Sequence, residues 1–300
     1  MSQFNSLLVA VDFKKSSQEF SHQACLIARQ LGTEVTLLYV MEGQPYNPYY
    51  QENTLTPLDD WLEKTRVKLD EVKTMFNSEG IAVNEHIIKE GKPWKLICET
   101  AKEINACGIV LGVGDHYFLE DIVGTTADKV TKYAEPPVIV INHESHHEGL
   151  KKIMCAVDFS ENSNKALENA VVIARDMEAH LDVVHVIHDY YADYYLNPFN
   201  PGLCTMDTDT EKEKVSQKVE ELLEEKKEKM HAPGVGSKVH VVHGSTGLEI
   251  TRLVEELNSD LLVVGACGHS AIMKFFLGNV TEKLLRKAPC SIMVIKNHED

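Results

Sequence analysis

The sequence has few basic residues for its length. Of its 300 residues, 30 are Lys or Arg and 46 are Asp or Glu, so the formal net charge is −16. Binding to a phosphate backbone requires a basic surface. The charge balance therefore argues against nucleic acid as a partner.

Long apolar runs are also missing. No stretch approaches the roughly 18 to 20 consecutive apolar residues that a membrane-spanning helix needs. The first residues lack the basic start and the apolar run of a secretory signal. We therefore expect no membrane insertion and a cytoplasmic location. The apolar share of 43% still suffices for the cores of about two domains.

Cysteine chemistry and two common motifs can be set aside. The seven cysteines are odd in number and no two form a Cys-x-x-Cys pair, which argues against a disulfide framework and a thiolate zinc site. Neither the P-loop pattern Gly-x4-Gly-Lys-Ser/Thr nor the nucleophile elbow Gly-x-Ser-x-Gly occurs. The commonest P-loop and α/β-hydrolase interpretations are thereby removed.

The chain repeats itself. The run Leu-Leu-Val-Ala-Val-Asp-Phe at 7–13 returns as Ile-Met-Cys-Ala-Val-Asp-Phe at 153–159, and Val-Ile-Val-Ile at 138–141 returns as Ile-Met-Val-Ile at 292–295. Similar landmarks in the same order indicate two copies of one domain, joined by a polar linker. We place the two domains at residues 1–145 and 150–300.

Within each copy, short β-branched runs alternate with longer amphipathic stretches, which is typical of βαβ units with a buried parallel sheet. Helices are expected between successive strands. The expected strands of the first copy are 6–12, 34–40, 82–88, 107–112 and 137–142. Those of the second copy are 152–158, 181–187, 238–243, 260–265 and 291–296.

A glycine-containing loop follows the fourth strand of the second copy. Gly265, Gly268 and Gly278 are followed by Asn279, where the next helix is expected to begin. Glycines let backbone N–H groups approach an anion, and a helix start offers further donors. Such a loop suits a phosphate, although tight turns alone also require glycine.

The spacing Gly-x2-Gly-x9-Gly, followed by a small polar residue, resembles the nucleotide-binding signature of the universal stress protein family. The first strand of each copy supports the resemblance. It ends in Ala-Val-Asp with a serine just beyond, as Asp158 with Ser160 and as Asp12 with Ser16. The resemblance covers almost the whole chain, twice, as in a tandem-type member.

The resemblance implies two tandem α/β domains, Rossmann-like and similar to the adenine-nucleotide α-hydrolase fold. Each would have five parallel strands in the order 3-2-1-4-5, with helices on both faces. Asp158 and Gly265 would then meet at the point where the strand order reverses, which is the usual binding crevice of open sheets. The resemblance also implies a pseudo-dimer that pairs the last strands, 138–141 and 292–295, and leaves a homodimer open.

The family pattern further implies that an adenine nucleotide lies between three groups of residues. The aspartate and the end of the second strand (Val186 or Ile187, and Val40 in the first copy) would flank the base and ribose. The glycine loop and the Ser or Thr after its last glycine would hold the phosphates.

Each copy departs from the pattern. The second carries Asn279 where a hydroxyl would meet a phosphate, and its longer side chain would crowd a terminal phosphate. The first keeps Gly124 and Thr125, but counting back gives Gly114 and then Leu111, so the first motif glycine is replaced unless the loop uses Gly112. Because Asp115, Glu120 and Asp121 would also repel a polyphosphate, we expect weak or no binding in the first domain.

Tyrosines gather in the segments after the second strand of each copy. Seven of the ten tyrosines lie in 46–50 and 190–195. Their rings could cover a base or line a pocket for an acyl or aromatic ligand. The alternative is that they pack as a small core or between the two halves.

Histidines offer no firm metal site. His143-Glu144-Ser145-His146-His147 matches the zinc pattern His-Glu-x-x-His, but that pattern requires a helix and this stretch is expected to be a linker. His185 and His188 lack a third obvious ligand. We expect them to be hydrogen-bonded or solvent-facing.

The leading expectation is a non-catalytic regulatory protein of the stress response. It would bind ATP, ADP or AMP mainly in the second domain, with no metal beyond the Mg²⁺ that accompanies a nucleotide. One alternative is a binder of an apolar or lipid-like metabolite in the same crevice, under the tyrosine loops. A second is a slow ATP hydrolase, for which no positioned base or nucleophile is evident.

Overall fold

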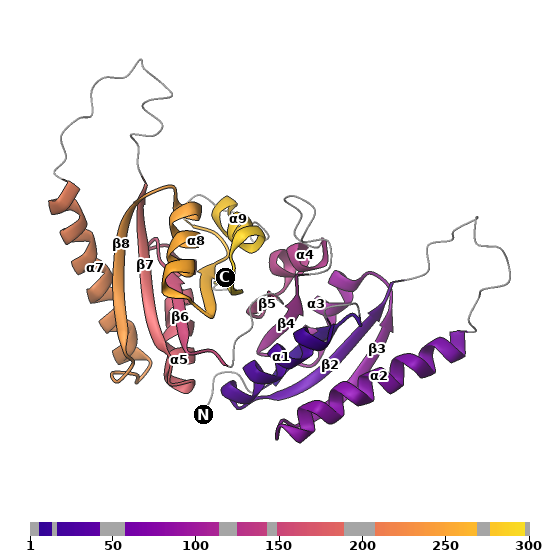
Figure 1. Ribbon diagram of the computed structural model, residues 1–300. Helices are drawn as coiled ribbons and strands as arrows, with labels where there is room; N and C mark the ends of the chain where they lie inside the picture. Colours follow the sequence, from indigo (N-terminus) through magenta and orange to yellow (C-terminus); the bar gives the residue numbers. More distant parts are fainter. Residues whose placement is uncertain are drawn as a thin grey trace, which may run out of the picture. The chain divides into compact units, whose positions relative to one another are not determined.

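The computed structural model describes residues 6–13, 17–42, 58–113, 125–142, 149–188, 208–268 and 277–297. The chain divides into two compact units, Met1–Gly149 and Leu150–Asp300. In each unit, parallel strands alternate with helices that lie on both faces of the sheet (Figure 1). The fold is therefore α/β, as the sequence predicts.

The described residues of unit 1 form five strands in the order β3-β2-β1-β4-β5, and all neighbours are parallel. The strands are β1 (Ser6–Val11), β2 (Glu34–Met41), β3 (Val83–Glu90), β4 (Gly108–Gly112) and β5 (Val138–Ile141). The helices are α1 (Ser17–Leu31), α2 (Leu58–Ser78), α3 (Pro93–Glu103) and α4 (Thr125–Tyr133).

Unit 2 repeats this arrangement in the order β8-β7-β6-β9-β10, again with parallel neighbours. The strands are β6 (Lys152–Ala156), β7 (His180–His188), β8 (Ser237–Gly244), β9 (Leu261–Gly265) and β10 (Ser291–Ile295). The helices are α5 (Glu161–Asp176), α7 (Thr208–Lys229), α8 (Thr246–Leu257) and α9 (Asn279–Lys287).

Most strands form the cores because they are almost wholly apolar, whereas β3 and β8 carry charged and polar residues and are largely half-buried or exposed. In β9 the first four residues, 261–264, are buried, and all of β5 and β10 is buried. Continuous burial of this kind requires cover on both faces of a sheet, which the helices provide. The alternation of apolar runs with amphipathic stretches was therefore sufficient to predict the elements.

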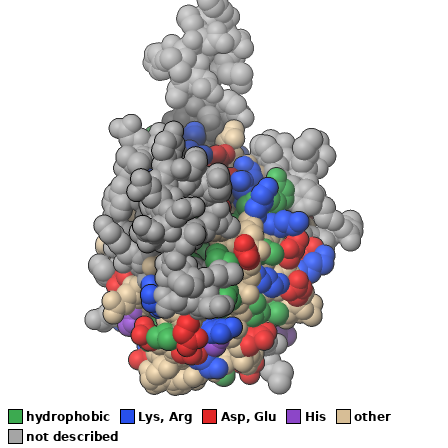
Figure 2. Space-filling model, turned by 90° about the vertical axis from the view of Figure 1, so that its right-hand side faces the viewer, with side chains coloured by type: hydrophobic (Ala, Val, Ile, Leu, Met, Phe, Trp, Pro, Cys, Tyr) green, Lys and Arg blue, Asp and Glu red, His purple; other side chains and the backbone are tan. Residues whose placement is uncertain are grey.

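Charged side chains of both signs share the surface. On the face drawn in Figure 2, Lys and Arg are interspersed with Asp and Glu, and the described residues of that face form no field of one sign. Within the described residues, no helix is long and apolar enough to cross a bilayer.

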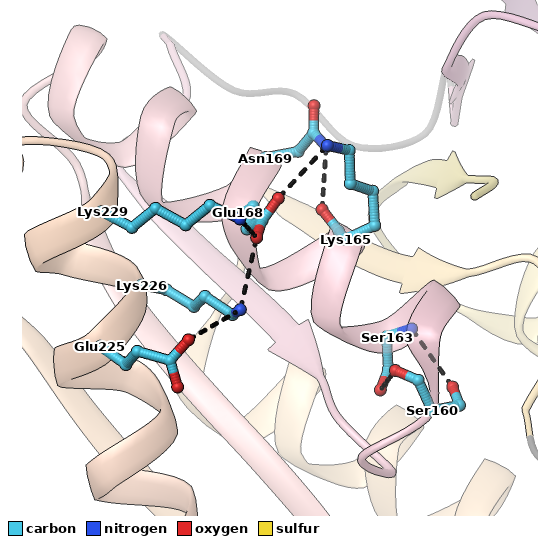
Figure 3. A network of polar contacts seen from close by, with 8 residues as sticks. All are labelled: Ser160, Ser163, Lys165, Glu168, Asn169, Glu225, Lys226 and Lys229. Atoms are coloured by element: carbon cyan, nitrogen blue, oxygen red, sulfur yellow. Dashed lines mark hydrogen bonds and ion pairs between the residues drawn. The ribbon is translucent and has the colours of Figure 1, made fainter. Parts of the chain in front are cut away.

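A buried carboxylate fastens α7 to α5 in unit 2. Glu168 of α5 accepts hydrogen bonds from Lys229 at 2.6 Å and from Lys165 at 3.3 Å, and its Oε1 lies 3.3 Å from the Nζ of Lys226 (Figure 3). The side chains of Glu168 and Lys226 are each about 10% exposed. Burial raises the pKa of Glu168, but the hydrogen bonds from the lysines outweigh it, so the pKa lies below its ordinary value.

We expect Glu168→Gln to lower the stability of unit 2 by about 1–3 kcal/mol at pH 7, because buried lysine charge loses its partner. A depressed carboxyl pKa contributes stability above the unfolded-state pKa and loses it as pH falls through the folded-state pKa. The difference from wild type should therefore shrink below about pH 4. Urea unfolding followed by circular dichroism at several pH values measures both effects.

Glu225→Gln serves as the control, because Glu225 also pairs with Lys226 but is 66% exposed. It should change stability by less than about 0.5 kcal/mol. An equal loss in the two variants would contradict the role assigned to Glu168.

Candidate functional site

The candidate site of unit 2 lies where its strand order reverses. β6 pairs with β7 on one side and with β9 on the other. The chain leaves the carboxyl ends of β6 and β9 toward the starts of α5 and α9. In open parallel sheets this is the place where ligands bind.

Asp158 is held in a turn between β6 and α5. Its Oδ1 accepts hydrogen bonds from the backbone N–H of Ser160 at 3.0 Å and from the Ser160 hydroxyl at 2.5 Å. Ser160 caps α5, because its Oγ also accepts from the backbone N–H of Ser163 at 3.2 Å. The Asp158 N–H donates in turn to the Ser163 hydroxyl at 3.2 Å. The carboxylate is therefore fixed by the same serine that starts the helix.

Asp158 and Gly268 come together. A Cβ placed at Gly268 would overlap Oδ2 of Asp158. The backbone at Gly268 thus lies directly against the carboxylate of the turn that follows the first strand of the unit. Only a residue without a side chain permits this approach.

Gly265 and Gly278 serve the packing of the unit. A Cβ at Gly265 would lie 2.9 Å from the backbone carbon of Asn162, so α5 crosses the end of β9 with no room for a side chain. Gly278 donates its N–H to the carbonyl of Ala266 at 2.8 Å, and a Cβ there would lie 3.3 Å from Cα of Cys267. These two motif glycines therefore have structural reasons to be glycine.

The start of α9 faces the end of β9. Gly278 is the N-cap residue and supplies no side chain to cap the helix, and Asn279, the first helical residue, is exposed. The Thr281 hydroxyl donates to the carbonyl of Gly265 at 2.8 Å, which ties the helix start to the strand end. An uncapped helix start offers backbone donors to an anion.

Cys267 lies beside Asp158 and has an unreactive environment. Asn162 donates from its amide to Sγ at 3.1 Å. Burial, and then the charge of Asp158, raises the pKa of the Cys267 thiol. The thiol is therefore protonated at neutral pH and is a weak nucleophile.

The residues predicted to flank the base and ribose of a nucleotide lie near the end of β7. Val186 and Ile187 are half-buried and pair with Val242 and His243 of β8. Next to them, His185 bonds through Nδ1 to the carbonyl of Val157 at 2.8 Å. Burial lowers the pKa of His185, so the ring is neutral, with its proton on Nδ1 because a carbonyl can only accept. His185 is thus hydrogen-bonded, one of the two roles expected for it.

Fewer of the site residues predicted for unit 1 lie within the described part of the chain. Asp12 is exposed, Val40 is half-buried at the end of β2, and Thr125 begins α4. Gly114 and Gly124 lie outside the described residues. So do the acidic residues 115, 120 and 121, Ser16, both tyrosine segments and the His-Glu-x-x-His stretch.

The strand register identifies the glycine of unit 1 that matches Gly265. β4 ends at Gly112, which pairs with Ile141, just as β9 ends at Gly265, which pairs with Ile295. Of the two readings of the first motif, the one that uses Gly112 therefore fits the sheet. A Cβ at Gly112 would lie 3.4 Å from the ring of Phe20, an ordinary contact, so this position is less crowded than 265.

Two features close to Asp158 were absent from the sequence prediction. The side chain of Asn162 contacts both Cys267 and Asn297. Its amide nitrogen donates to Sγ of Cys267, and its Oδ1 accepts a hydrogen bond from the backbone N–H of Asn297 at 2.8 Å. Phe159, next to Asp158, adopts a left-handed backbone with φ +64°. The Asp-Phe pair in both copies was the signal that could have drawn attention to it. Among the described residues, no three His, Cys, Asp or Glu side chains gather as a metal site.

Comparisons with known proteins agree with the repeated α/β fold. The sequence matches the Universal stress protein family over residues 3–142 and again over 149–296. A relative from Staphylococcus aureus (strain USA300), which carries a universal stress protein name, is 34% identical over 154 residues, covering 50% of this chain and 86% of the relative.

Two solved structures share the fold along the whole chain. A universal stress protein from Archaeoglobus fulgidus DSM 4304 is 21% identical with a TM-score of 0.70, and the match covers 99% of both chains. A functionally unknown protein from Pseudomonas aeruginosa PAO1 is 16% identical with a TM-score of 0.65, over 98% of this chain and 94% of that one. At these identities the likeness concerns the fold alone.

We expect Gly265→Ala to destabilise unit 2 by about 1–3 kcal/mol, because the new methyl group would press on the backbone of α5 and not on a flexible side chain. The matched variant Gly112→Ala should stay within about 0.5 kcal/mol of wild type, because only the Phe20 ring is near. Chemical unfolding of both variants tests the comparison. Equal losses would show that position 265 is no more tightly packed than position 112.

Proposed function

Because the chain belongs to the universal stress protein family and carries its domain twice, we propose that it is a regulatory protein that binds an adenine nucleotide in unit 2. The base and ribose lie between Asp158 and the end of β7 at Val186. The phosphates lie near Gly268 and the start of α9 at Asn279. This assignment involves no catalytic step by the protein.

The approach of Asp158 to Gly268 is the observation that carries the proposal. It brings a fixed carboxylate acceptor, suited to ribose hydroxyls, next to the backbone of a glycine loop. The uncapped start of α9 follows ten residues later in sequence and supplies donors for negative charge. A carboxylate acceptor and backbone donors in the same unit suit the ribose and the phosphates of a nucleotide, which supports the proposal.

Asn279 sets the expected preference among nucleotides. Its exposed amide can donate to a phosphate but is longer than a serine hydroxyl. We therefore propose that AMP or ADP binds at least as well as ATP. Any Mg²⁺ would enter with the phosphates, which are its usual ligands.

Unit 1 serves mainly as the structural partner in this proposal. Its Asp12 is exposed, in contrast to the half-buried Asp158. Burial, and then the charge of Asp12, raises the pKa of Tyr39 beside it. The pairing of the two units through their last strands stays a prediction.

Binding would act at Gly268 and at the start of α9, which are the described residues nearest to the proposed phosphates. A ligand that prefers one conformation of the protein shifts the population toward that conformation. A partner that contacts the start of α9 would then distinguish the ligand-bound protein from the ligand-free protein.

Calorimetric titration with ATP, ADP and AMP should give one site per chain. The heat should disappear in Gly268→Val, because the side chain would displace the Asp158 carboxylate. Gly234→Val is the matched control and should bind like wild type, because nothing lies within 4 Å of a Cβ at that position. If the wild-type chain binds no adenine nucleotide at millimolar concentration, the proposal fails.

Asn279→Ser should tighten ATP binding more than AMP binding, because the shorter hydroxyl makes room for a terminal phosphate. The ratio of the two dissociation constants, measured for both proteins, isolates this effect. An unchanged ratio would mean that residue 279 does not contact the phosphates.

A further inference from the structure

Phenylalanine in a left-handed conformation follows the first-strand aspartate in both units. Phe13 has φ +52° and Phe159 has φ +64°. Bulky side chains rarely adopt this region, and it persists only where the surroundings enforce it. The other non-glycine residues with positive φ among those described all lie at helix C-terminal ends, where it is common: Asn105, Glu178, His231 and Asn258.

In unit 2 the Phe159 ring is held by two side chains. The ring of His185, from β7, lies with its centroid 5.0 Å away and is tilted by 44°. The Nζ of Lys218, from α7, lies 4.1 Å from the Phe159 centroid, which is a cation–π distance. Lys218 directly precedes Val219, which is fully buried. The burial of Val219 fixes the rotation of α7 about its axis and hence the position of Lys218.

Unit 1 contains the same arrangement with a different ring. Phe13 stacks on Tyr39 at 5.2 Å, and the Nζ of Lys68 lies 5.6 Å from the Phe13 centroid. Lys68 directly precedes the fully buried Leu69 of α2. The contact therefore occurs twice, built from the second strand and the following helix of each unit.

Hydrogen bonds also fix Val157, which precedes Asp158 in the turn. Val157 donates its N–H to the carbonyl of Val184 at 2.9 Å and accepts from His185 at 2.8 Å. Asp158 follows immediately and is bonded forward to Ser160. Residue 159 is then the one backbone position between two fixed segments, so its conformation sets the direction of the Asp158 carboxylate.

We propose that His185 and Lys218 are positioning residues of the Asp158 site. By holding the Phe159 ring they keep residue 159 left-handed, and this turn directs the carboxylate to Gly268. The effect on ligand binding rests on the proposed function, whereas the effect on the turn does not. Helix α7 is thereby coupled to the site through one lysine.

Two substitutions at Lys218 test the role by binding. Lys218→Met keeps the chain length and removes the cation, so ATP and adenosine should each bind about two- to fivefold more weakly. Lys218→Arg should restore both, because a guanidinium also lies over aromatic rings. Lys68→Met, the matched change in unit 1, should leave them unaltered. Weakened ATP binding with unchanged adenosine binding would indicate a direct phosphate contact and would overturn the positioning role.

Amide hydrogen exchange without ligand keeps the two proposals distinguishable. The Ser160 N–H, which donates to Asp158, should exchange about two- to fivefold faster in Lys218→Met and faster still in Phe159→Gly. Glycine adopts the left-handed region without strain, so Phe159→Gly should still fold. Unchanged exchange in the Lys218 variant overturns the positioning role. Absent nucleotide binding with faster exchange overturns only the proposed function.

Discussion

The close crossing of α5 over the end of β9 is the constraint on which the architecture of unit 2 depends. Gly265 lets the helix start lie against the strand, and Ser160 can then cap that helix while holding Asp158. Because the helix start is fixed there, the carboxylate reaches Gly268 in the neighbouring loop. One missing side chain thus sets the position of the aspartate, the cap and the loop together.

The sequence alone was enough to predict the fold class and most of the elements. Uninterrupted apolar runs such as 261–264 can only be buried in a sheet covered on both faces, and the repeat of Ala-Val-Asp-Phe doubles that evidence. The importance of Asp158 was expected from the resemblance to the family, and its contact with a ligand stays a prediction.

Details of the site could not be predicted, for physical reasons. The match of Gly112 to Gly265 depends on the register with β5 and β10, which periodicity does not encode. The contact of Lys218 with Phe159 depends on the rotation of α7 about its axis, which the buried Val219 sets. Glycine spacing likewise does not reveal which glycines serve packing and which serve a ligand.

The crowding at Gly265 has a consequence for how such motifs are read across sequences. Packing demands a glycine at position 265 whether or not the unit binds a ligand, whereas Gly112 makes only an ordinary contact with Phe20. A glycine at position 265 therefore indicates an intact scaffold. Evidence of a working site has to come from positions such as 268, whose neighbour is the carboxylate of Asp158, the proposed ligand contact.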